Sequence, residues 1–318
     1  MQTSPRIGII GTGAIGGFYG LMLARAGFDV HFLLRSEYDA VAEHGLFVHS
    51  PVHGELHLHP VQAYRDVAEM PACDWLLVGA KSTSNPTLAP IVSAAAAEGA
   101  KVVLLQNGLN NEASMRKLLP DHVHLMGGLC YVSLFRTEPG HITHGANGLI
   151  DFGYHSGPAT DEEGVQAIIG ELAEMLKTAG IPTRILPNVD AARWQKLIWN
   201  GPFNGASVVL DAGTDAMLTD PGSRQLITDF MAEITTAAAA CGHPIPDGFA
   251  DNLLAATAKM PDYYPSMYQD WKHKRPMELD SLYAEPIALA KAAGAEMPKT
   301  EVLLNMLRFI QARRLADA

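Results

Sequence analysis

The most restrictive feature of the chain is a glycine-rich turn between a short apolar run and the first helical stretch. Residues 6–10 (RIGII) are typical of a buried strand, and residues 14–26 of a helix. The turn between them has the spacing GxGxxG. In such a turn the first glycine permits the tight bend, the second lets a pyrophosphate approach the backbone, and the third allows close helix–strand packing. The helix N-terminus then offers unpaired N–H groups to the anion. The sequence therefore predicts a dinucleotide site at Gly11, Thr12, Gly13, Ala14, Ile15 and Gly16.

The end of the second expected strand indicates which dinucleotide is bound. That strand covers residues 29–34 and runs into Arg35 and Ser36. NAD-binding proteins usually place an acidic residue there, about 20 residues after the glycine motif, to bind the ribose 2′-hydroxyl. An arginine instead suits a 2′-phosphate, which it can bind with charge-assisted hydrogen bonds. Glu37 lies close enough to keep the NAD alternative open, but Arg35 favours NADP(H).

Further apolar strands, at residues 74–79 and 101–105, alternate with helical stretches, which predicts a parallel sheet covered on both faces. Lys81 and Asn107 follow these two strands. Ligands bind outside the carboxyl ends of strands in such sheets, so both residues are expected near the cofactor. After Asp161 the pattern becomes helical, and 318 residues favour two domains. We predict a Rossmann-type, doubly wound α/β domain over residues 1–187 and an all-helical domain over residues 188–318.

Composition narrows the range of partners. The 23 basic and 34 acidic side chains give a net charge of −11, which argues against a nucleic-acid-binding protein. No apolar stretch approaches the ~20 residues of a membrane span, and the three cysteines are scattered, as in reduced cytoplasmic proteins. Five histidines between residues 44 and 59 lack the partners of a metal site. They predict a solvated hairpin around His53-Gly54 and no bound metal.

In the second half, Lys196, Asn200 and Asn204 follow one another at intervals of four, which places them along one face of a helix. Asparagine is unfavourable inside helices, so this alignment indicates a functional face. The alternative is an ordinary solvent-exposed face. Pro202 lies inside the pattern and is expected to kink the helix near Ile198.

A second polar cluster lies in the stretch YYPSMYQDWKHKRPMELD and contains Ser266, Asp270, Arg275 and Glu278. Structural explanations exist for these residues too. Ser266, with a glutamine three residues later, fits a helix capping box, and Glu278 fits the first turn of a helix after Pro276.

Taken together, the segments GTGAIG, LLR, AKS, QNG, KLIWNGPFN and SMYQDWKHKRPMELD resemble the ketopantoate reductase (2-dehydropantoate 2-reductase) family over nearly the whole chain. The last two segments are the specific ones, because many dehydrogenases share GxGxxG. The resemblance implies an NADP-dependent oxidoreductase that reduces a 2-oxo acid by hydride transfer from NADPH. The substrate it implies is ketopantoate, which would be reduced to pantoate in pantothenate biosynthesis.

The resemblance also implies roles for individual residues. Lys196 and Glu278 match the catalytic lysine and glutamate, with Lys196 as the proton donor. The substrate-binding positions it implies are Asn107, Asn200, Asn204 and Ser266. The cofactor-binding positions, besides the glycine motif, are Arg35, Lys81, Asn107 and Glu278. Asp270 and Arg275 match a polar pair whose roles stay open.

The sequence departs from the family pattern beside the expected substrate. Gly205-Ala206 stands where Asn-Pro is common, and Met277 where threonine is common. Two alternatives therefore remain: a dehydrogenase of the same fold acting on another 2-oxo acid or carbonyl compound, and a non-catalytic NADP(H)-binding protein. A homodimer is also left open.

Overall fold

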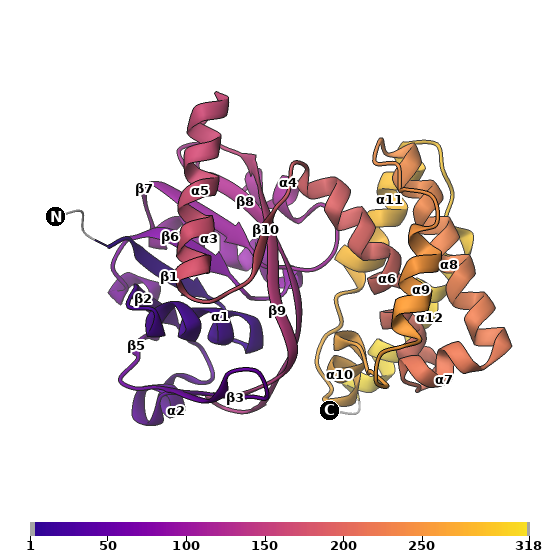
Figure 1. Ribbon diagram of the computed structural model, residues 1–318, viewed down its shortest axis with the longest axis horizontal. Coiled ribbons are helices and arrows are strands. Elements are labelled where there is room, and N and C mark those ends of the chain that lie inside the picture. Colours follow the sequence, from indigo (N-terminus) through magenta and orange to yellow (C-terminus); the bar gives the residue numbers. More distant parts are fainter. Residues whose placement is uncertain (1–3, 317–318) are drawn as a thin grey trace. The chain divides into compact units, whose positions relative to one another are not determined.

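The computed structural model describes residues 4–316 and divides into two compact units (Figure 1). The first comprises the chain up to Asn107 together with Asn111–Val189, and the second comprises Gly108–Asn110 together with the chain from Asp190 onward. The predicted domain boundary after residue 187 stays a prediction. That prediction did not include residues 108–110 in the second unit.

The first unit is built on a sheet in which six strands, from the β5 edge inward, run parallel in the order β5-β2-β1-β6-β7-β8. This is the strand order of doubly wound dinucleotide-binding sheets, with the order reversing beside β1. The apolar runs of β1, β6 and β7 are buried because helices cover both faces. The strands are β1 (Arg6–Ile10), β2 (Asp29–Leu33), β5 (Gln62–Tyr64), β6 (Cys73–Val78), β7 (Ala96–Leu104) and β8 (His124–Glu138).

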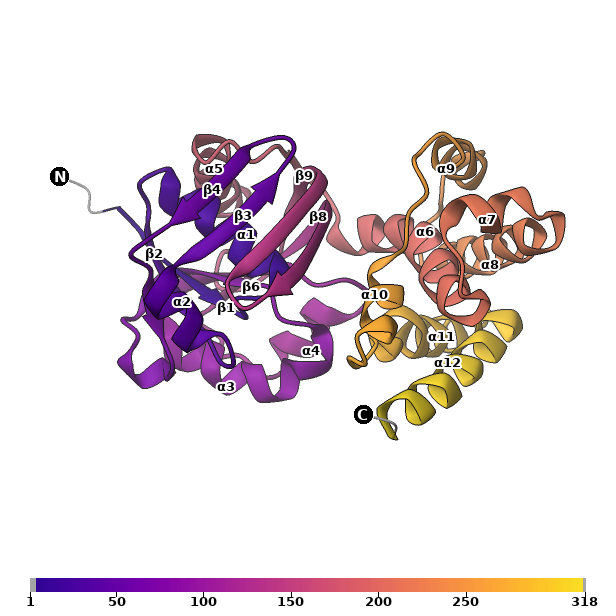
Figure 2. The ribbon, with the colours of Figure 1, turned by 90° about the horizontal axis from the view of Figure 1, so that it is seen from below.

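Four more strands extend the sheet beyond β8 and make it mixed. The long hairpin of β8 and β9 (His141–Ser156) turns at Pro139-Gly140. Next to β9 lies β3 (Leu46–Ser50), which pairs with β4 (Gly54–Leu58) as the hairpin expected around His53-Gly54. The short strand β10 (Thr183–Ile185) also pairs with β9. These strands curl around one face of the sheet, where α1 lies (Figure 2).

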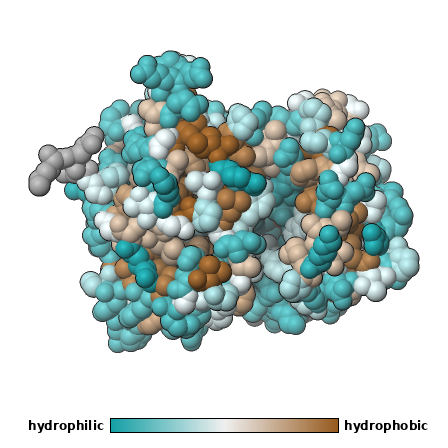
Figure 3. All heavy atoms as spheres, viewed as in Figure 1, coloured by the Kyte–Doolittle hydropathy of each residue, from teal (hydrophilic) through white to brown (hydrophobic). Residues whose placement is uncertain are grey.

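Helices of the first unit lie on both faces of the sheet (Figure 2). One core cluster joins α1 and α5 to one face, and another joins α3 and α4 to the opposite face. The first turn of α5 carries Glu162 and Glu163 and projects as a hydrophilic tip (Figure 3). The helices are α1 (Ala14–Arg25), α2 (Tyr38–His44), α3 (Asn85–Ala95), α4 (Asn111–Arg116) and α5 (Glu162–Thr178), with the 3₁₀ turns η1 (Val67–Glu69) and η2 (Ser82–Ser84).

The regular secondary structure of the second unit is entirely helical over its described residues. Its core gathers apolar residues of α6, α8, α10 and α12 around Phe203 and Tyr283, both of which are fully buried. The predicted fold class, a Rossmann-type sheet followed by a helical domain, is confirmed. The helices are α6 (Val189–Leu210), α7 (Thr214–Thr219), α8 (Pro221–Ala240), α9 (Phe249–Thr257), α10 (Ser266–Lys272), α11 (Glu285–Ala292) and α12 (Pro298–Ala316), with the π-helical turn η3 (Asp280–Ala284).

The helix α6 continues from Val189 to Leu210 with Pro202 inside it. The proline removes one donor of the helix ladder without ending the helix. Between residues 4 and 316, no helix combines the length and the apolar character that crossing a membrane would need.

Candidate active site

The glycine turn after β1 has the geometry that a dinucleotide requires. Gly11 has a φ of +87°, and a Cβ there would lie 2.5 Å from the backbone N of Ala80. A Cβ at Gly16 would collide with the carbonyl oxygen of Gly11. Gly13, by contrast, has open space where its Cβ would be, and it caps α1 without any side-chain hydrogen bond to the helix. The α1 N-terminus therefore has room for a pyrophosphate to approach its backbone N–H groups.

Thr12 is the one residue of the turn with a buried polar side chain, and its Oγ1 donates to the carbonyl of Leu33 at 3.1 Å. This bond ties the glycine turn to the end of β2. The two segments that a dinucleotide phosphate and its adenosine ribose would contact are thereby held together.

The two charged residues after β2 differ in their surroundings. Arg35 is exposed at the strand end. Glu37 is buried, forms an ion pair with Arg136, and accepts a hydrogen bond from the N–H of Gly140 at 3.2 Å. The carboxylate that kept the NAD alternative open is therefore engaged with the β8–β9 hairpin. The exposed guanidinium is the group available at this position for a 2′-phosphate.

The loops after β6 and β7 are held together by a buried amide pair. Gln106 donates to the carbonyl of Ala80 at 2.9 Å and to Oδ1 of Asn85 at 2.6 Å, while Asn85 donates back to Oε1 of Gln106 at 3.1 Å. Lys81 lies in the first of these loops and Asn107 in the second, both half-buried. The two predicted residues thus share one edge of the sheet with the glycine turn.

Residues 108–110 leave the first unit and join the second. The N–H of Leu109 donates to the carbonyl of Ser281 at 2.9 Å, and Nδ2 of Asn110 donates to Oε2 of Glu285 at 2.8 Å. Gly108 packs against Ser281 so closely that a Cβ there would overlap it, and the φ of Gly108 is +92°. Glycine is required here because of both the approach and the backbone angle.

Lys196 and Asn200 line one small pocket of the second unit, as their spacing of four on α6 implies. The pocket is completed by Gly108, Arg193, Leu197 and Leu282. Arg193 is buried and donates to the carbonyl of Gly108 at 3.1 Å. Sequence reasoning did not select Arg193, although it lies three residues before Lys196 on the same helix.

Asn204 lies one turn beyond Asn200 but has a different environment. It is buried, and its Nδ2 donates to the carbonyl of Asn200 at 2.9 Å. Its Oδ1 accepts the N–H of Met267 at 2.9 Å and the hydroxyl of Ser266 at 3.4 Å. The amide therefore joins α6 to the beginning of α10. The N-cap of α10 is Pro265 and Ser266 is the first residue of the helix, so Ser266 does not hold the cap position that the capping-box interpretation gave it.

The remaining predicted residues lie in the segment from the second half of α10 to the start of η3. Arg275 donates from Nε to Oδ1 of the buried Asp270 at 3.1 Å, so the pair closes the turn after α10. Glu278 is buried just before η3, and its carbonyl accepts the N–H of Leu282, a pocket residue, at 3.3 Å. The adjoining Met277 donates its N–H to Oε1 of Gln311 at 2.7 Å.

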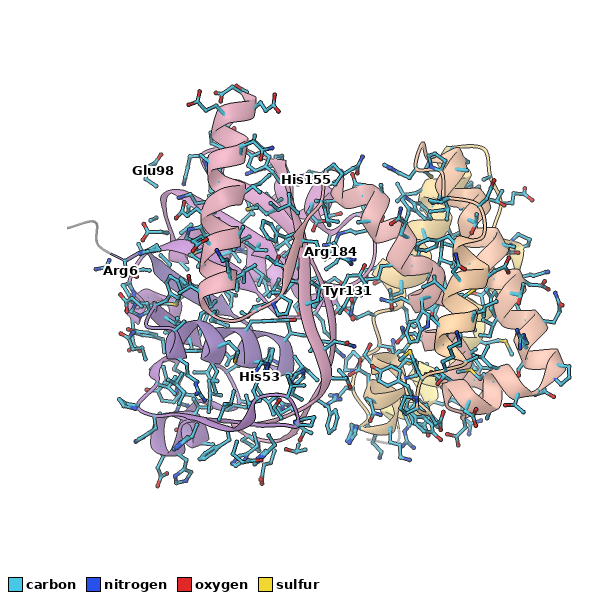
Figure 4. The ribbon with its side chains drawn as sticks, in the orientation of Figure 1. Arg6, His53, Glu98, Tyr131, His155 and Arg184 are labelled. Atoms are coloured by element: carbon cyan, nitrogen blue, oxygen red, sulfur yellow. The ribbon has the colours of Figure 1, made fainter. Side chains whose placement is uncertain are left out.

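The histidines of the β3–β4 hairpin pack mainly on aromatic rings. The ring of Phe47 stacks between those of His57 and His141, at centroid distances of 4.0 and 4.4 Å. His53 turns inward, 5.7 Å from the ring of the fully buried His144 (Figure 4). Within the described part of the chain, no group of three or more histidine, cysteine or acidic residues is arranged to hold a metal ion.

Comparison with known proteins identifies the family. The sequence profile described as ketopantoate reductase PanE/ApbA matches residues 7–157, and that of its C-terminal domain matches residues 188–311. The chain belongs to the ketopantoate reductase family. The 2-dehydropantoate 2-reductase of Nostoc sp. strain PCC 7120 is 38% identical over 96% of this chain and 95% of its own length. The family and the oxidoreductase class predicted from the sequence are confirmed.

Solved structures of the family share the fold. The 2-dehydropantoate 2-reductase of Geobacter metallireducens has a TM-score of 0.89 and 36% identity, over 95% of this chain and 99% of its own. That of Methylococcus capsulatus has a TM-score of 0.86 and 30% identity, over 97% of each chain. The roles of the individual site residues stay predictions.

Proposed function

We propose that this ketopantoate reductase family member reduces 2-dehydropantoate to pantoate with NADPH. The observation that carries the proposal is the pocket of the second unit in which Lys196 and Asn200 lie together. A cation and an amide in one partly buried pocket suit a substrate with a carbonyl and a carboxylate. Relatives that align over nearly the whole chain are named 2-dehydropantoate 2-reductase, which supports the same substrate here.

NADP(H) is the cofactor that the first unit fits. The open space at Gly13 and the uncapped start of α1 accept a pyrophosphate, and the exposed Arg35 accepts a 2′-phosphate. When bound, NADPH supplies the hydride that attacks the C2 carbonyl carbon. Lys81 and Asn107 are proposed to contact the cofactor from the loops that Gln106 joins.

Lys196 is proposed to act on the substrate oxygen. As hydride adds to C2, the electron pair of the carbonyl bond moves to oxygen, which becomes an alkoxide. The Lys196 ammonium stabilises that charge and gives up one proton, which completes the hydroxyl group. The buried Glu278 carboxylate accepts a hydrogen bond from a substrate hydroxyl. Asn200 and Ser266 donate to the substrate carboxylate, and Asn204 holds Ser266 in place.

Other 2-oxo acids are the alternative substrates, because the departures at Gly205-Ala206 and Met277 adjoin Asn204 and Glu278 in the sequence. D-mandelate dehydrogenase, at 20% identity and a TM-score of 0.85, shows that this fold also occurs in a dehydrogenase of another 2-hydroxy acid. A non-catalytic NADP(H)-binding protein is disfavoured by the presence of both Lys196 and Glu278. The cytoplasmic location and the homodimer stay predictions; one structural neighbour, from Staphylococcus aureus, is described as dimeric.

A panel of 2-oxo acids tests the substrate proposal. Ketopantoate, 2-oxoisovalerate, pyruvate and phenylglyoxylate are each offered with NADPH, and the consumption of NADPH is compared as kcat/KM. We expect ketopantoate to give the highest value, with pantoate as the product identified by mass spectrometry. A higher kcat/KM for another member of the panel would refute the substrate assignment and retain the reaction class.

A further inference from the structure

The hydroxyl of Tyr283 is inserted against the backbone of the helix that carries Lys196. Tyr283 is completely buried, and its hydroxyl donates to the carbonyl of Gly201 at 2.8 Å. The backbone of Gly205, one turn further along α6, lies beside the same hydroxyl. Gly201 and Gly205 are i and i+4 on α6, so the carbonyl that accepts the Tyr283 hydroxyl is the one that a helix pairs with the Gly205 N–H. Burial raises the pKa of Tyr283 far above its usual value, so the hydroxyl stays a neutral donor.

The sequence of α6 leaves room for this contact. A Cβ at Gly205 would lie 2.7 Å from the Tyr283 hydroxyl oxygen, closer than real Cβ contacts come. The absence of a side chain at Gly205 therefore leaves room for the Tyr283 hydroxyl.

The contact lies beside the proposed substrate face. Gly201 and Gly205 directly follow Asn200 and Asn204, so they lie on the adjacent face of α6, rotated by about 100°. Tyr283 itself belongs to η3, the π-helical turn that begins two residues after Glu278. Its neighbour Leu282 lines the Lys196 pocket. One hydroxyl thus connects the helix of Lys196 to the segment of Glu278, and π-helical turns are frequent at functional sites.

We propose that Tyr283 is a positioning residue for the reduction proposed above, because its hydroxyl fixes α6 and η3 in the register that places Lys196 opposite Glu278's segment. The hydroxyl does not touch the substrate. Its removal takes away the hydrogen bond from η3 to the Gly201 carbonyl, which lets α6 shift relative to η3. The kinetic test of this proposal rests on the proposed function, because it measures the reduction of ketopantoate. The structural test does not, because it follows the backbone of α6.

The test compares Tyr283→Phe with Tyr19→Phe. Tyr19 is a matched control because it is also completely buried and also donates its hydroxyl to a backbone carbonyl, that of Gly148 at 3.3 Å. We expect Tyr283→Phe to lower kcat for ketopantoate by about 10- to 100-fold, as small displacements of catalytic groups do, with the KM for NADPH unchanged. Tyr19→Phe keeps the wild-type kcat. Equal kcat values for wild type and Tyr283→Phe would overturn the proposal.

A second variant keeps the proposal testable if Tyr283→Phe fails to fold. Gly205→Ala forces a Cβ against the hydroxyl, so it should lower kcat in the wild type. In the Tyr283→Phe background the same change should cost less, because the hydroxyl is gone and only the Leu303 side chain still meets the new Cβ. The two effects would then be non-additive. Strict additivity of the two substitutions would contradict a shared contact.

Amide hydrogen exchange separates this proposal from the proposed function. Peptides covering residues 195–210 are followed by mass spectrometry in wild type, Tyr283→Phe and Tyr19→Phe. We expect altered exchange in Tyr283→Phe alone. If the wild type turns over no ketopantoate, the proposed substrate fails while this measurement still decides whether Tyr283 fixes α6. Unchanged exchange in α6 would overturn the positioning role whatever the substrate.

Discussion

Oδ1 of Asn204 accepts the backbone N–H of Met267 at 2.9 Å, and this bond joins two segments that lie 63 residues apart in sequence. The same amide donates to the carbonyl of Asn200. Three of its hydrogen-bonding positions are therefore used within the protein, counting the Ser266 hydroxyl. Among the polar residues that the sequence aligns on α6, Asn204 holds the site together, while Lys196 and Asn200 line the pocket.

Asn204→Ala is expected to destabilise the protein, because it leaves the buried N–H of Met267 without its acceptor. An unsatisfied buried donor costs about 1–3 kcal/mol. Thermal unfolding followed by circular dichroism should show a lower Tm than that of Asn200→Ala, whose side chain is half-buried. A Tm equal to that of the wild type would mean that Asn204 serves the substrate only.

Lys196→Ala is expected to lower kcat by about 10²- to 10⁴-fold, the usual contribution of a general acid. NADPH binding, measured by fluorescence titration, should be unaffected, since the residues of the glycine turn belong to the first unit. Lys259→Ala is the control, because it removes an exposed lysine of the second unit, to which Lys196 also belongs. Near-normal turnover by Lys196→Ala would remove this lysine from the mechanism.

Arg35→Ala is expected to weaken selectivity for NADPH over NADH by about 10- to 100-fold, which corresponds to a charged hydrogen bond of ~1.5–3 kcal/mol. The readout is the ratio of kcat/KM for the two cofactors. Arg6→Ala is the control, because Arg6 lies at the amino end of β1, opposite the glycine turn. An unchanged ratio would assign 2′-phosphate recognition to another residue.

Glu37→Gln is expected to lower the stability of the protein without changing its cofactor selectivity, the reverse of Arg35→Ala. It removes the charge that pairs with Arg136, so we expect a lower Tm. The NADPH to NADH ratio should stay that of the wild type, because the Glu37 carboxylate is directed to Arg136 and Gly140. A shift of the ratio toward NADPH would show that Glu37 reaches the ribose after all.

Acid should destabilise the first unit partly through His53. Burial lowers the pKa of His53 below its usual value, and the nearby His144 and Arg25 add to this effect. Because the unfolded chain takes up the proton first, the contribution of His53 to stability is complete above about pH 6.5 and is lost as the pH falls below it. We expect the fall in Tm between about pH 8 and about pH 5.5 to be smaller in His53→Asn than in wild type. Replacement of the exposed His44 should leave this fall unchanged.

Local patterns predicted the nucleotide-binding unit well because its features are local. Gly11, Gly13 and Gly16 each show the environment that the GxGxxG spacing implies: a positive φ, open space and close packing. The alternation of apolar strands and helices was enough to predict the parallel core of the sheet. Its extension by β3, β4 and β9 depends on pairing across some 90 residues, which no local pattern records.

The candidate site was harder to derive, because its details depend on tertiary contacts. A spacing of four placed Lys196, Asn200 and Asn204 on one helix face, yet it could not show that the Asn204 amide is directed to α10. The passage of residues 108–110 into the second unit leaves no signal beyond a glycine in an Asn-Gly pair. The contact of the Tyr283 hydroxyl with α6 could not be foreseen, because it depends on how η3 packs against that helix.

Steady-state oxidation of NADPH, with NADH in parallel, by the purified protein given ketopantoate tests the proposed reaction most directly. We expect rapid turnover to pantoate with a clear preference for NADPH. Binding of NADPH with no turnover of ketopantoate would contradict the proposed reaction, and would separate the nucleotide site from the chemistry assigned to Lys196.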